Sequence, residues 1–269
     1  EELYRADPNM KGLVLDLRND PGGLLDAAVA LSAVFLPENV TVVSTNGQLA
    51  DSKFTYKAIP QHYLRRGGSD PVRRLTEATN GIYKRIPLVV LVNEGSASAS
   101  EIVAGALQDH KRATIMGSQT FGKGSVQTVR PLGPDTGLKL TTARYYTPSG
   151  TSIQGKGIVP DVLVDETPDG NLFAALRTRE ADLNNSLGGA PHGGMTDAQR
   201  DAEQKREEAR EAARKKLEEE ARKAPGQRLV PEFGSEKDFQ LQQALNQLKG
   251  RPVLVSKSLS VRTEEKKEN

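Results

Sequence analysis

The sequence contains no cysteine and no tryptophan, and aromatic residues make up only 4% of its 269 residues. The absence of cysteine excludes disulfide frameworks, thiol nucleophiles and thiolate metal sites. Only three histidines are present, and because His62, His110 and His192 are scattered along the chain we expect neither a metal centre nor another cofactor. No apolar run approaches the ~18 residues that a membrane-spanning helix needs. These absences leave an enzyme or a binding protein that works without a metal.

A charge excess of either sign is also lacking. The chain has 37 basic and 35 acidic residues, a formal net charge of +2. Domains that bind nucleic acid usually carry a clear basic excess, so we expect no nucleic-acid partner. An initiator methionine and a secretory signal are missing as well, and residues 1–6 resemble the end of a helix. We therefore expect this chain to be a fragment of a longer protein.

Short apolar runs alternate with helical patterns in the first half of the chain. Residues 12–18, 88–92 and 113–116 are runs of the kind that fill buried strands. Apolar residues recur at helical spacing from residue 24 to 35, and a second helix extends to about Gln108. This succession of strand, helix and strand predicts an α/β layered domain.

Composition divides the rest of the chain. Residues 182–195 are rich in Asn and Gly and indicate a linker, so the core is expected to span residues 1–181. Residues 196–223 are almost entirely Glu, Lys, Arg, Ala and Gln, with acid–base pairs four apart, and predict a charged, solvent-exposed helix. Residues 224–269 are expected to hold an amphipathic helix and a tail.

The amphipathic helix is expected over residues 235–249, with Ser235 as its N-cap and Gly250 at its end. One face of this helix carries an apolar stripe that consists of Leu241, Ala244, Leu245 and Leu248. The stripe favours packing of the helix onto its own domain, and the alternative is contact with a partner or a second copy. A further short helix is predicted after Asp70, because Asp70 can cap it and Pro71 suits its first position.

Residues 93–102, with the sequence NEGSASASEI, are the most informative segment. They lie where a buried strand turns into a helix, so a serine there would direct its Oγ off the strand end. Free N–H groups at the start of the helix could stabilise a developing oxyanion. The alternative is an ordinary turn of small residues.

A nucleophilic serine needs a base, and no histidine has a suitable context; His110 follows a helix beside Lys111 and is expected to be exposed. A neutral lysine can serve instead, provided that it is sheltered from water and from carboxylates. Lys123 fits, because Gly122 and Gly124 flank it and no acid is near it in sequence. Gln127 offers a neutral amide that can orient the amine.

A phosphate-binding loop is the rival interpretation of the same lysine. Residues 117–123 match the first seven positions of that motif, but Gly124 stands where a Ser or Thr should bind Mg²⁺. The residues after Lys123 also predict a strand, whereas the motif requires a helix. These two departures argue against an NTPase.

Four blocks in this order resemble the C-terminal processing peptidases, also called tail-specific serine proteases. The resemblance covers Gly12 to about Val162, apart from residues 56–85, which look like an insertion. The blocks are LDLRNDPGG at residues 15–23, VNEGSASASE at 92–101, GSQTFGKGSVQ at 117–127, and YYTPSG at 145–150 with GIVPD at 157–161.

The resemblance implies roles for individual residues. The nucleophile falls on Ser98, the general base on Lys123, and the residue that positions the lysine on Gln127. Oxyanion donors would be the N–H of Ala99 and that of Gly22 or Gly23, and the sequence does not choose between the two glycines. The implied fold has layers of helices and sheet like those of ClpP and the crotonases.

The resemblance also implies a function, namely a serine endopeptidase that cuts proteins near their C-termini through an acyl-enzyme. Its partners would be proteins or peptides with exposed C-termini, and the C-terminal helices could mediate homo-oligomers or bind an adaptor. The family's usual PDZ domain and signal peptide precede this region, so we expect a periplasmic or exported protein. Two alternatives remain: a catalytically silent peptide-binding scaffold and a crotonase-like acyl-CoA enzyme.

Overall fold

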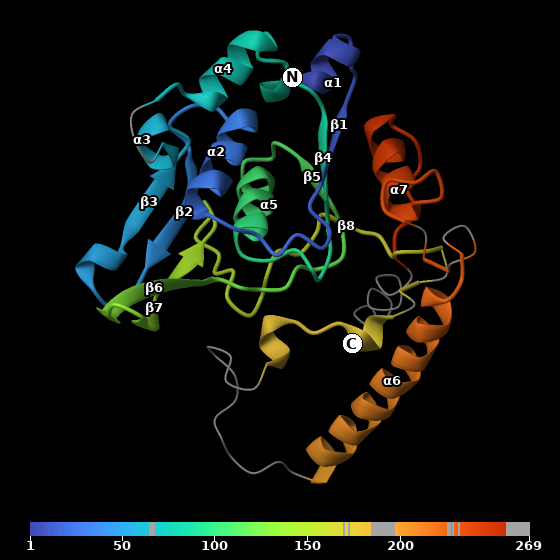
Figure 1. Ribbon diagram of the computed structural model, residues 1–269. Coiled ribbons are helices and arrows are strands. Elements are labelled where there is room, and N and C mark those ends of the chain that lie inside the picture. The colour runs from blue at the N-terminus through green and yellow to red at the C-terminus, as the bar shows by residue number, and fades with distance from the viewer. Residues whose placement is uncertain are drawn as a thin grey trace, which may run out of the picture.

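The computed structural model describes residues 1–64, 68–168, 170–171, 173–183, 197–224, 227, 229–230 and 232–256. Two four-stranded sheets organise the chain into a mixed α/β fold (Figure 1). The parallel sheet has the order β1-β4-β5-β8, with β1 at Leu13–Asp16, β4 at Leu88–Val92, β5 at Thr114–Gly117 and β8 at Val162–Leu163. The antiparallel sheet has the order β3-β2-β7-β6, with β2 at Thr41–Asn46, β3 at Phe54–Lys57, β6 at Ser125–Gly133 and β7 at Thr136–Tyr146.

Seven α-helices and four 3-10 turns connect and cover these sheets in the described ranges. The α-helices are α1 at Glu2–Ala6, α2 at Leu25–Phe35, α3 at Pro60–Tyr63, α4 at Pro71–Ala78, α5 at Ala99–Asp109, α6 at Asp197–Ala221 and α7 at Phe239–Leu248. The 3-10 turns are η1 at Ala50–Ser52, η2 at Ile82–Lys84, η3 at Ala174–Leu176 and η4 at Glu180–Asp182. No helix in these ranges is both long enough and apolar enough to cross a membrane.

The central strand β4 shows why the apolar runs of the sequence are continuous. Leu88, Val90 and Val92 pack into the core between the two sheets, whereas Val89 and Leu91 pack into a second core on the opposite face. Alternate side chains of a strand point to opposite faces, so a strand covered on both sides needs apolar residues throughout. The predicted α/β domain with strand, helix and strand is confirmed.

Helices cover both faces of the parallel sheet. In Figure 1, α2 and α5 lie between the two sheets, and α7 lies on the far side of β1, β4 and β5. Ala244 of α7 is fully buried there, and Leu241 and Leu248 pack against the same core. The predicted packing of this helix onto its own domain is therefore confirmed.

The predicted start of that helix is wrong. It begins at Phe239, and its N-cap is Asp238, whose carboxylate accepts the N–H of Leu241 at 3.1 Å. Asp238 is itself held by Arg18, as described below, whereas the Ser235 hydroxyl is buried without a hydrogen-bond partner among the described residues. A long-range ion pair, rather than the local serine, decides where this helix starts.

Helix α6 occupies most of the charged segment, and it approaches η3. Its single large apolar residue, Leu217, is 44% exposed. The expected linker lies almost wholly outside the described residues, as does the expected tail from residue 257 onward. Asp70 caps α4 as predicted, because its carboxylate accepts two backbone N–H groups of the first turn.

Candidate active site

Three loops meet at the carboxyl edge of the parallel sheet, where β1, β4 and β5 end. We call them the glycine turn (residues 19–23), the serine turn (residues 93–98) and the lysine loop (residues 118–124). The carboxyl edge is where α/β sheets usually bind their ligands. Every predicted site residue apart from Gln127 lies in one of these loops or directly after it.

The three serines in and after the serine turn have different surroundings. Ser96 is completely buried, and its Oγ donates to the backbone O of Leu17 at 2.7 Å. The Oγ of Ser100 donates to the Asp20 carboxylate at 2.7 Å. The half-buried Ser98 is the N-cap of α5 and forms a capping box with Glu101, and within the described part of the chain its hydroxyl donates to no acceptor. Of the three serines, Ser98 therefore has the O–H proton that is not already used to build the turn.

Ser98 also has an unusual backbone conformation. Its φ of 55° and ψ of −112° lie in a region that residues with a Cβ seldom adopt, and such strain costs on the order of 1–3 kcal/mol. Its N–H donates to the Glu101 carboxylate at 2.8 Å, which holds the residue in place at the start of α5. Strained residues of this kind cluster at active sites.

Hydrogen bonds join the glycine turn to the serine turn. The Asn19 N–H donates to Asn93 Oδ1 at 2.8 Å, and Asn93 Nδ2 donates back to Asn19 Oδ1 at 2.9 Å. The Ala97 N–H donates to the backbone O of Asp20 at 3.0 Å. The two turns are thus one hydrogen-bonded unit, although they are far apart in sequence.

Two unused N–H groups lie beside Ser98. Gly22 has a φ of +87°, and a Cβ at this position would lie 2.4 Å from the backbone O of Ala97 and 2.6 Å from the N of Ala99. Only glycine fits there, and its N–H is already engaged by Asp20 Oδ1 at 3.1 Å. In the described structure, the N–H groups of Ala99 and Gly23 donate to no acceptor. Of the two glycines, Gly23 therefore has the N–H free to bind a substrate oxygen.

The lysine loop bonds directly to the serine turn. The Phe121 N–H donates to the backbone O of Ser96 at 3.0 Å. Gly124 lies so close to another backbone segment that an added Cβ would come within 2.2 Å of the Gln154 N. The residues after Lys123 form β6, which confirms the strand expected there and excludes the helix that a phosphate-binding loop requires.

A buried carboxylate connects the two catalytic candidates. Glu101 is fully buried, and its Oε2 accepts both the Ser98 N–H at 2.8 Å and the Lys123 N–H at 2.9 Å. Its Oε1 accepts the Gly122 N–H at 2.6 Å and the Thr120 hydroxyl at 2.5 Å. Burial raises the pKa of the Glu101 carboxyl above its usual 4.5, and these four hydrogen bonds oppose that shift. Because one oxygen accepts both N–H groups, the backbones of Ser98 and Lys123 are neighbours.

The side chains of the two candidates are not bonded to each other. Lys123 is half-buried, and within the described residues its Nζ forms neither a hydrogen bond nor an ion pair. The carboxylate beside it accepts the lysine's backbone N–H and not its amine. Gln127 is exposed on β6, and its amide makes no hydrogen bond in that part of the chain. The structure thus makes the backbones of Ser98 and Lys123 neighbours, whereas Gln127 is an exposed residue of β6.

An apolar cavity of about 190 Å³ lies beside the glycine turn and the start of α5. Leu31 and Val103 contribute to its walls, together with Leu17, Leu24, Ala27, Ala28 and Ala99. Because Gly22, Gly23 and Ala99 also line it, a substrate side chain in this cavity would lie next to the two free N–H groups.

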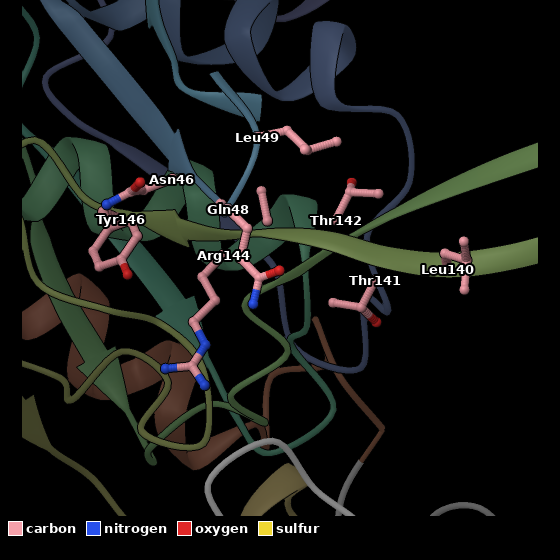
Figure 2. A pocket seen from close by; sticks show the side chains of 10 residues that line it. Asn46, Gln48, Leu49, Leu140, Thr141, Thr142, Arg144 and Tyr146 are labelled. Atoms are coloured by element: carbon pink, nitrogen blue, oxygen red, sulfur yellow. The ribbon is translucent and has the colours of Figure 1, made fainter. Parts of the chain in front are cut away.

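A larger groove of about 610 Å³ runs along β7 (Figure 2). Asn46, Gln48 and Leu49 lie on one side of it, and Leu140, Thr141, Arg144 and Tyr146 lie on β7. Figure 2 shows the Arg144 guanidinium extending away from the strand. Thr141 pairs with Gln127 in the β6–β7 register, so β6 lies beside the strand that lines the groove.

The described histidines take no part in this site. His110 is half-buried rather than exposed, because its Nε2 hydrogen-bonds the backbone O of Thr41 at 2.7 Å. His62 Nδ1 accepts the Lys57 N–H at 2.7 Å, and His192 lies outside the described residues. Across the ranges that the structure covers, no group of three His, Asp or Glu side chains is arranged to hold a metal ion.

Sequence reasoning missed Glu101, Asn19, Asn93 and Asp20. For Glu101 a signal existed, because Ser98 followed three residues later by Glu is the spacing of a helix capping box. The two asparagines and Asp20 carry no comparable signal. Their partners come from other strands and become neighbours only when the sheet forms.

The comparisons with known proteins concern the first 164 residues. A model of peptidase family S41 matches residues 1–164. A carboxy-terminal-processing protease of Bartonella bacilliformis is 52% identical over 157 residues, which are 58% of this chain and 32% of that protein. A carboxyl-terminal-processing protease of Synechocystis sp. is 42% identical over 155 residues, 58% of this chain and 31% of that protein.

A further curated relative and a solved structure are also similar to this chain. A probable CtpA-like serine protease of Staphylococcus haemolyticus is 41% identical over 156 residues, 58% of this chain and 27% of that protein. Among solved structures, a photosystem II D1 C-terminal processing protease is 38% identical, with a TM-score of 0.48, over 60% of this chain and 36% of that one. The chain spans about a third of the length of the curated relatives it matches.

Proposed function

This chain belongs to peptidase family S41, and we propose that it forms the catalytic part of a serine endopeptidase that cleaves proteins near their C-termini. The names of the curated relatives support the activity and the position of the cut. Those relatives are proteases, so neither the acyl-CoA enzyme nor the silent scaffold is favoured.

The shared oxygen of Glu101 carries this proposal. It accepts the N–H groups of Ser98 and Lys123, and this supports a site in which the Ser98 hydroxyl, the Lys123 amine and the N–H groups of Ala99 and Gly23 act together. A nucleophile, a base and oxyanion donors are the parts that acyl transfer requires.

The mechanism follows from these positions. Neutral Lys123 takes the proton of the Ser98 hydroxyl while Oγ forms a bond to the scissile carbonyl carbon. The carbonyl oxygen gains the negative charge and accepts hydrogen bonds from the Ala99 and Gly23 N–H groups. The C–N bond then breaks, and the lysine returns its proton to the leaving amine.

Water completes the cycle. Lys123 takes a proton from a water molecule, the water oxygen attacks the acyl-enzyme ester, and Ser98 leaves with the proton restored to its Oγ. Gln127, four residues after Lys123 on β6, would orient the amine through its side-chain amide. Lys123 carries both protons in this sequence: the first passes from Ser98 to the leaving amine, and the second passes from water to Ser98.

The dyad is tested in the full-length protein that contains this chain. We expect Ser98→Ala and Lys123→Ala each to lower cleavage of a peptide substrate by about 10³-fold or more, with unchanged thermal unfolding. Lys156→Ala is the matched control, because Lys156 is exposed but lies beside Gly122. A fluorophosphonate probe should label the wild type and the control but neither dyad variant. Retained turnover in either variant would contradict the dyad.

We also propose a layered fold like that of ClpP and the crotonases, with residues 56–85 as an insertion, and the order of sheet, helices, sheet and α7 supports it. The expected core of residues 1–181 is extended by α7, whose Ala244 is buried in the second core. Leu241 and Leu248 of α7 pack against its own sheet, whereas Leu245 of the predicted stripe is exposed. Assembly through the C-terminal region would therefore use mainly α6. An exported or periplasmic location follows from the resemblance alone, and fractionation of cells that make the full-length protein tests it.

A further inference from the structure

Residues 177–182 lie beyond the region that matches family S41 and contact two of the catalytic loops. We call these residues the strap. They begin after η3 and include η4. No role in catalysis is predicted for them from the sequence, since they carry no recognisable motif.

The first contact joins the strap to the serine turn. Arg177 Nη1 lies 2.6 Å from both carboxylate oxygens of Glu94, which precedes Ser98 by four residues. Nη2 of the same guanidinium contacts Glu166, which follows β8. The three side chains are only 13–18% exposed. Charge-assisted bonds in such a sheltered place are strong and directional, so Arg177 ties the serine turn to the edge of the parallel sheet.

The second contact joins the strap to the lysine loop. The Arg179 guanidinium donates to Gln119 Oε1 at 3.1 Å, to the Thr120 backbone O at 3.3 Å and to the Lys156 backbone O at 2.8 Å. The N–H of the next strap residue, Glu180, donates to the backbone O of Phe121 at 3.0 Å. The strap therefore holds the lysine loop at the three residues that precede Gly122.

A third contact joins the strap to the end of the lysine loop, after Lys123. Glu180 Oε1 accepts the Gln154 amide at 3.0 Å, and Gln154 Oε1 accepts the Gly124 N–H at 3.1 Å. The strap is thus hydrogen-bonded to the chain before Lys123, at Phe121, and through Gln154 to the chain after it, at Gly124. One short segment therefore constrains both loops that carry the dyad.

We propose that the strap is a positioning element that sets the geometry between Ser98 and Lys123, with Arg177 and Arg179 as its positioning residues. This inference rests on the proposed function. A displacement of about 1 Å at reacting groups can cost roughly a hundredfold in rate. The buried Glu101 joins the backbones of Ser98 and Lys123, and the strap holds the serine turn and the lysine loop through separate contacts.

The test compares Arg177→Gln and Arg179→Ala with the wild type in the full-length protein. We expect kcat and the rate of fluorophosphonate labelling of Ser98 to fall about 10- to 100-fold, with KM nearly unchanged. Arg177→Lys should recover part of the loss, because it keeps the charge but not the planar fork. Arg73→Ala is the matched control, since Arg73 is exposed on α4, away from the strap, and forms an ion pair with Glu77.

A loss of stability alone must be distinguished from a positioning role. Val72→Ala removes buried methyl groups in α4, away from the strap, and should lower the unfolding temperature without changing the labelling rate well below it. If the strap variants label Ser98 as fast as Val72→Ala does, the strap is merely structural and the proposal is overturned.

Amide hydrogen exchange gives a readout that does not depend on activity. The N–H groups of Ser98, Gly122 and Lys123 all donate to Glu101, and we expect them to exchange at least about tenfold faster in Arg179→Ala. Unchanged exchange at all three positions overturns the strap. A wild-type protein that neither cleaves peptides nor labels at Ser98 overturns the proposed function instead, and the exchange rates still decide the role of the strap.

Discussion

At the scale of single residues, Glu101 has the most demanding environment in the site. A buried carboxylate without a cation is stable only if other donors satisfy its oxygens, and here three N–H groups and one hydroxyl do so. Burial raises the pKa of Glu101 despite those bonds. The folded protein therefore binds this proton more tightly than the unfolded chain, so ionised Glu101 opposes folding increasingly as the pH rises above 4.5. Because this carboxylate bonds the backbones of both Ser98 and Lys123, we assign it a positioning role.

We expect Glu101→Gln to lower kcat about 10- to 100-fold and to change stability by only about 1–3 kcal/mol. A glutamine has one acceptor oxygen, so it cannot bind all four donors, and its NH₂ must face some of them. Peptide turnover and chemical denaturation measure the two effects separately. The exposed Glu77→Gln serves as the control. A Glu101→Gln enzyme with wild-type kcat would show that the carboxylate does not position the dyad.

At the scale of elements, the docking of α7 depends on a buried ion pair. Arg18 Nη2 lies 2.6 Å from Asp238 Oδ2 and 2.6 Å from Asp16 Oδ2, and the guanidinium stacks 3.8 Å from the centre of the Phe233 ring. Burial alone would raise the pKa of Asp238, but hydrogen bonds from Arg18 and two backbone N–H groups hold it below its usual 3.8. Asp238 thus caps α7 and anchors it to the strand end that leads into the glycine turn.

Asp238→Asn should lower the free energy of unfolding by about 3 kcal/mol near neutral pH, because it leaves the buried Arg18 with Asp16 as its one carboxylate. The folded-state pKa of Asp238 lies below its usual value of 3.8. Ionised Asp238 therefore stabilises the folded protein fully above about pH 4, and this stabilisation is lost as the pH falls through the folded-state pKa. Denaturation measured at several pH values should show that the difference in the free energy of unfolding between variant and wild type becomes smaller in acid. The exposed Asp51→Asn controls for the change of charge, and a pH-independent difference would argue against the ion pair.

At the scale of the whole molecule, the second core connects the C-terminal region to the catalytic sheet. Val89, Leu91, Met116 and Val164 are almost fully buried, and Ala244 of α7 is buried among them. Covering each large apolar side chain contributes roughly 1.5–3 kcal/mol. The part of the chain that matches family S41 therefore depends on a helix that lies about 75 residues beyond it.

Ending the chain after residue 230 removes α7 and exposes this face of the sheet. We expect the shortened protein to aggregate or to lose cooperative unfolding, as measured by size-exclusion chromatography and calorimetry. Ending the chain after residue 256 keeps α7 and is the matched control. An unchanged unfolding temperature after the first truncation would show that the second core is dispensable.

The sequence by itself determined those features that depend on local pattern. The apolar run of β4 and the helical spacing of α2 predicted their elements because burial on two faces or one stripe leaves a periodic signal. The serine turn was predicted from small residues between a strand and a helix, and the residues after Lys123 correctly predicted a strand, β6. The family resemblance singled out Ser98, Lys123 and Ala99 as candidates.

Only the tertiary structure decided which groups are engaged and which are free. Ser96 and Ser100 bond to Leu17 and Asp20, which lie 79 and 80 positions away, so no local pattern could show that they are occupied. Asp238 replaced Ser235 as the cap of α7 because Arg18, 220 positions away, holds its carboxylate. Hydrogen bonds between distant segments form only when the sheet brings strand ends together, and for that reason the fold, not the sequence pattern, selects the residues that position the site.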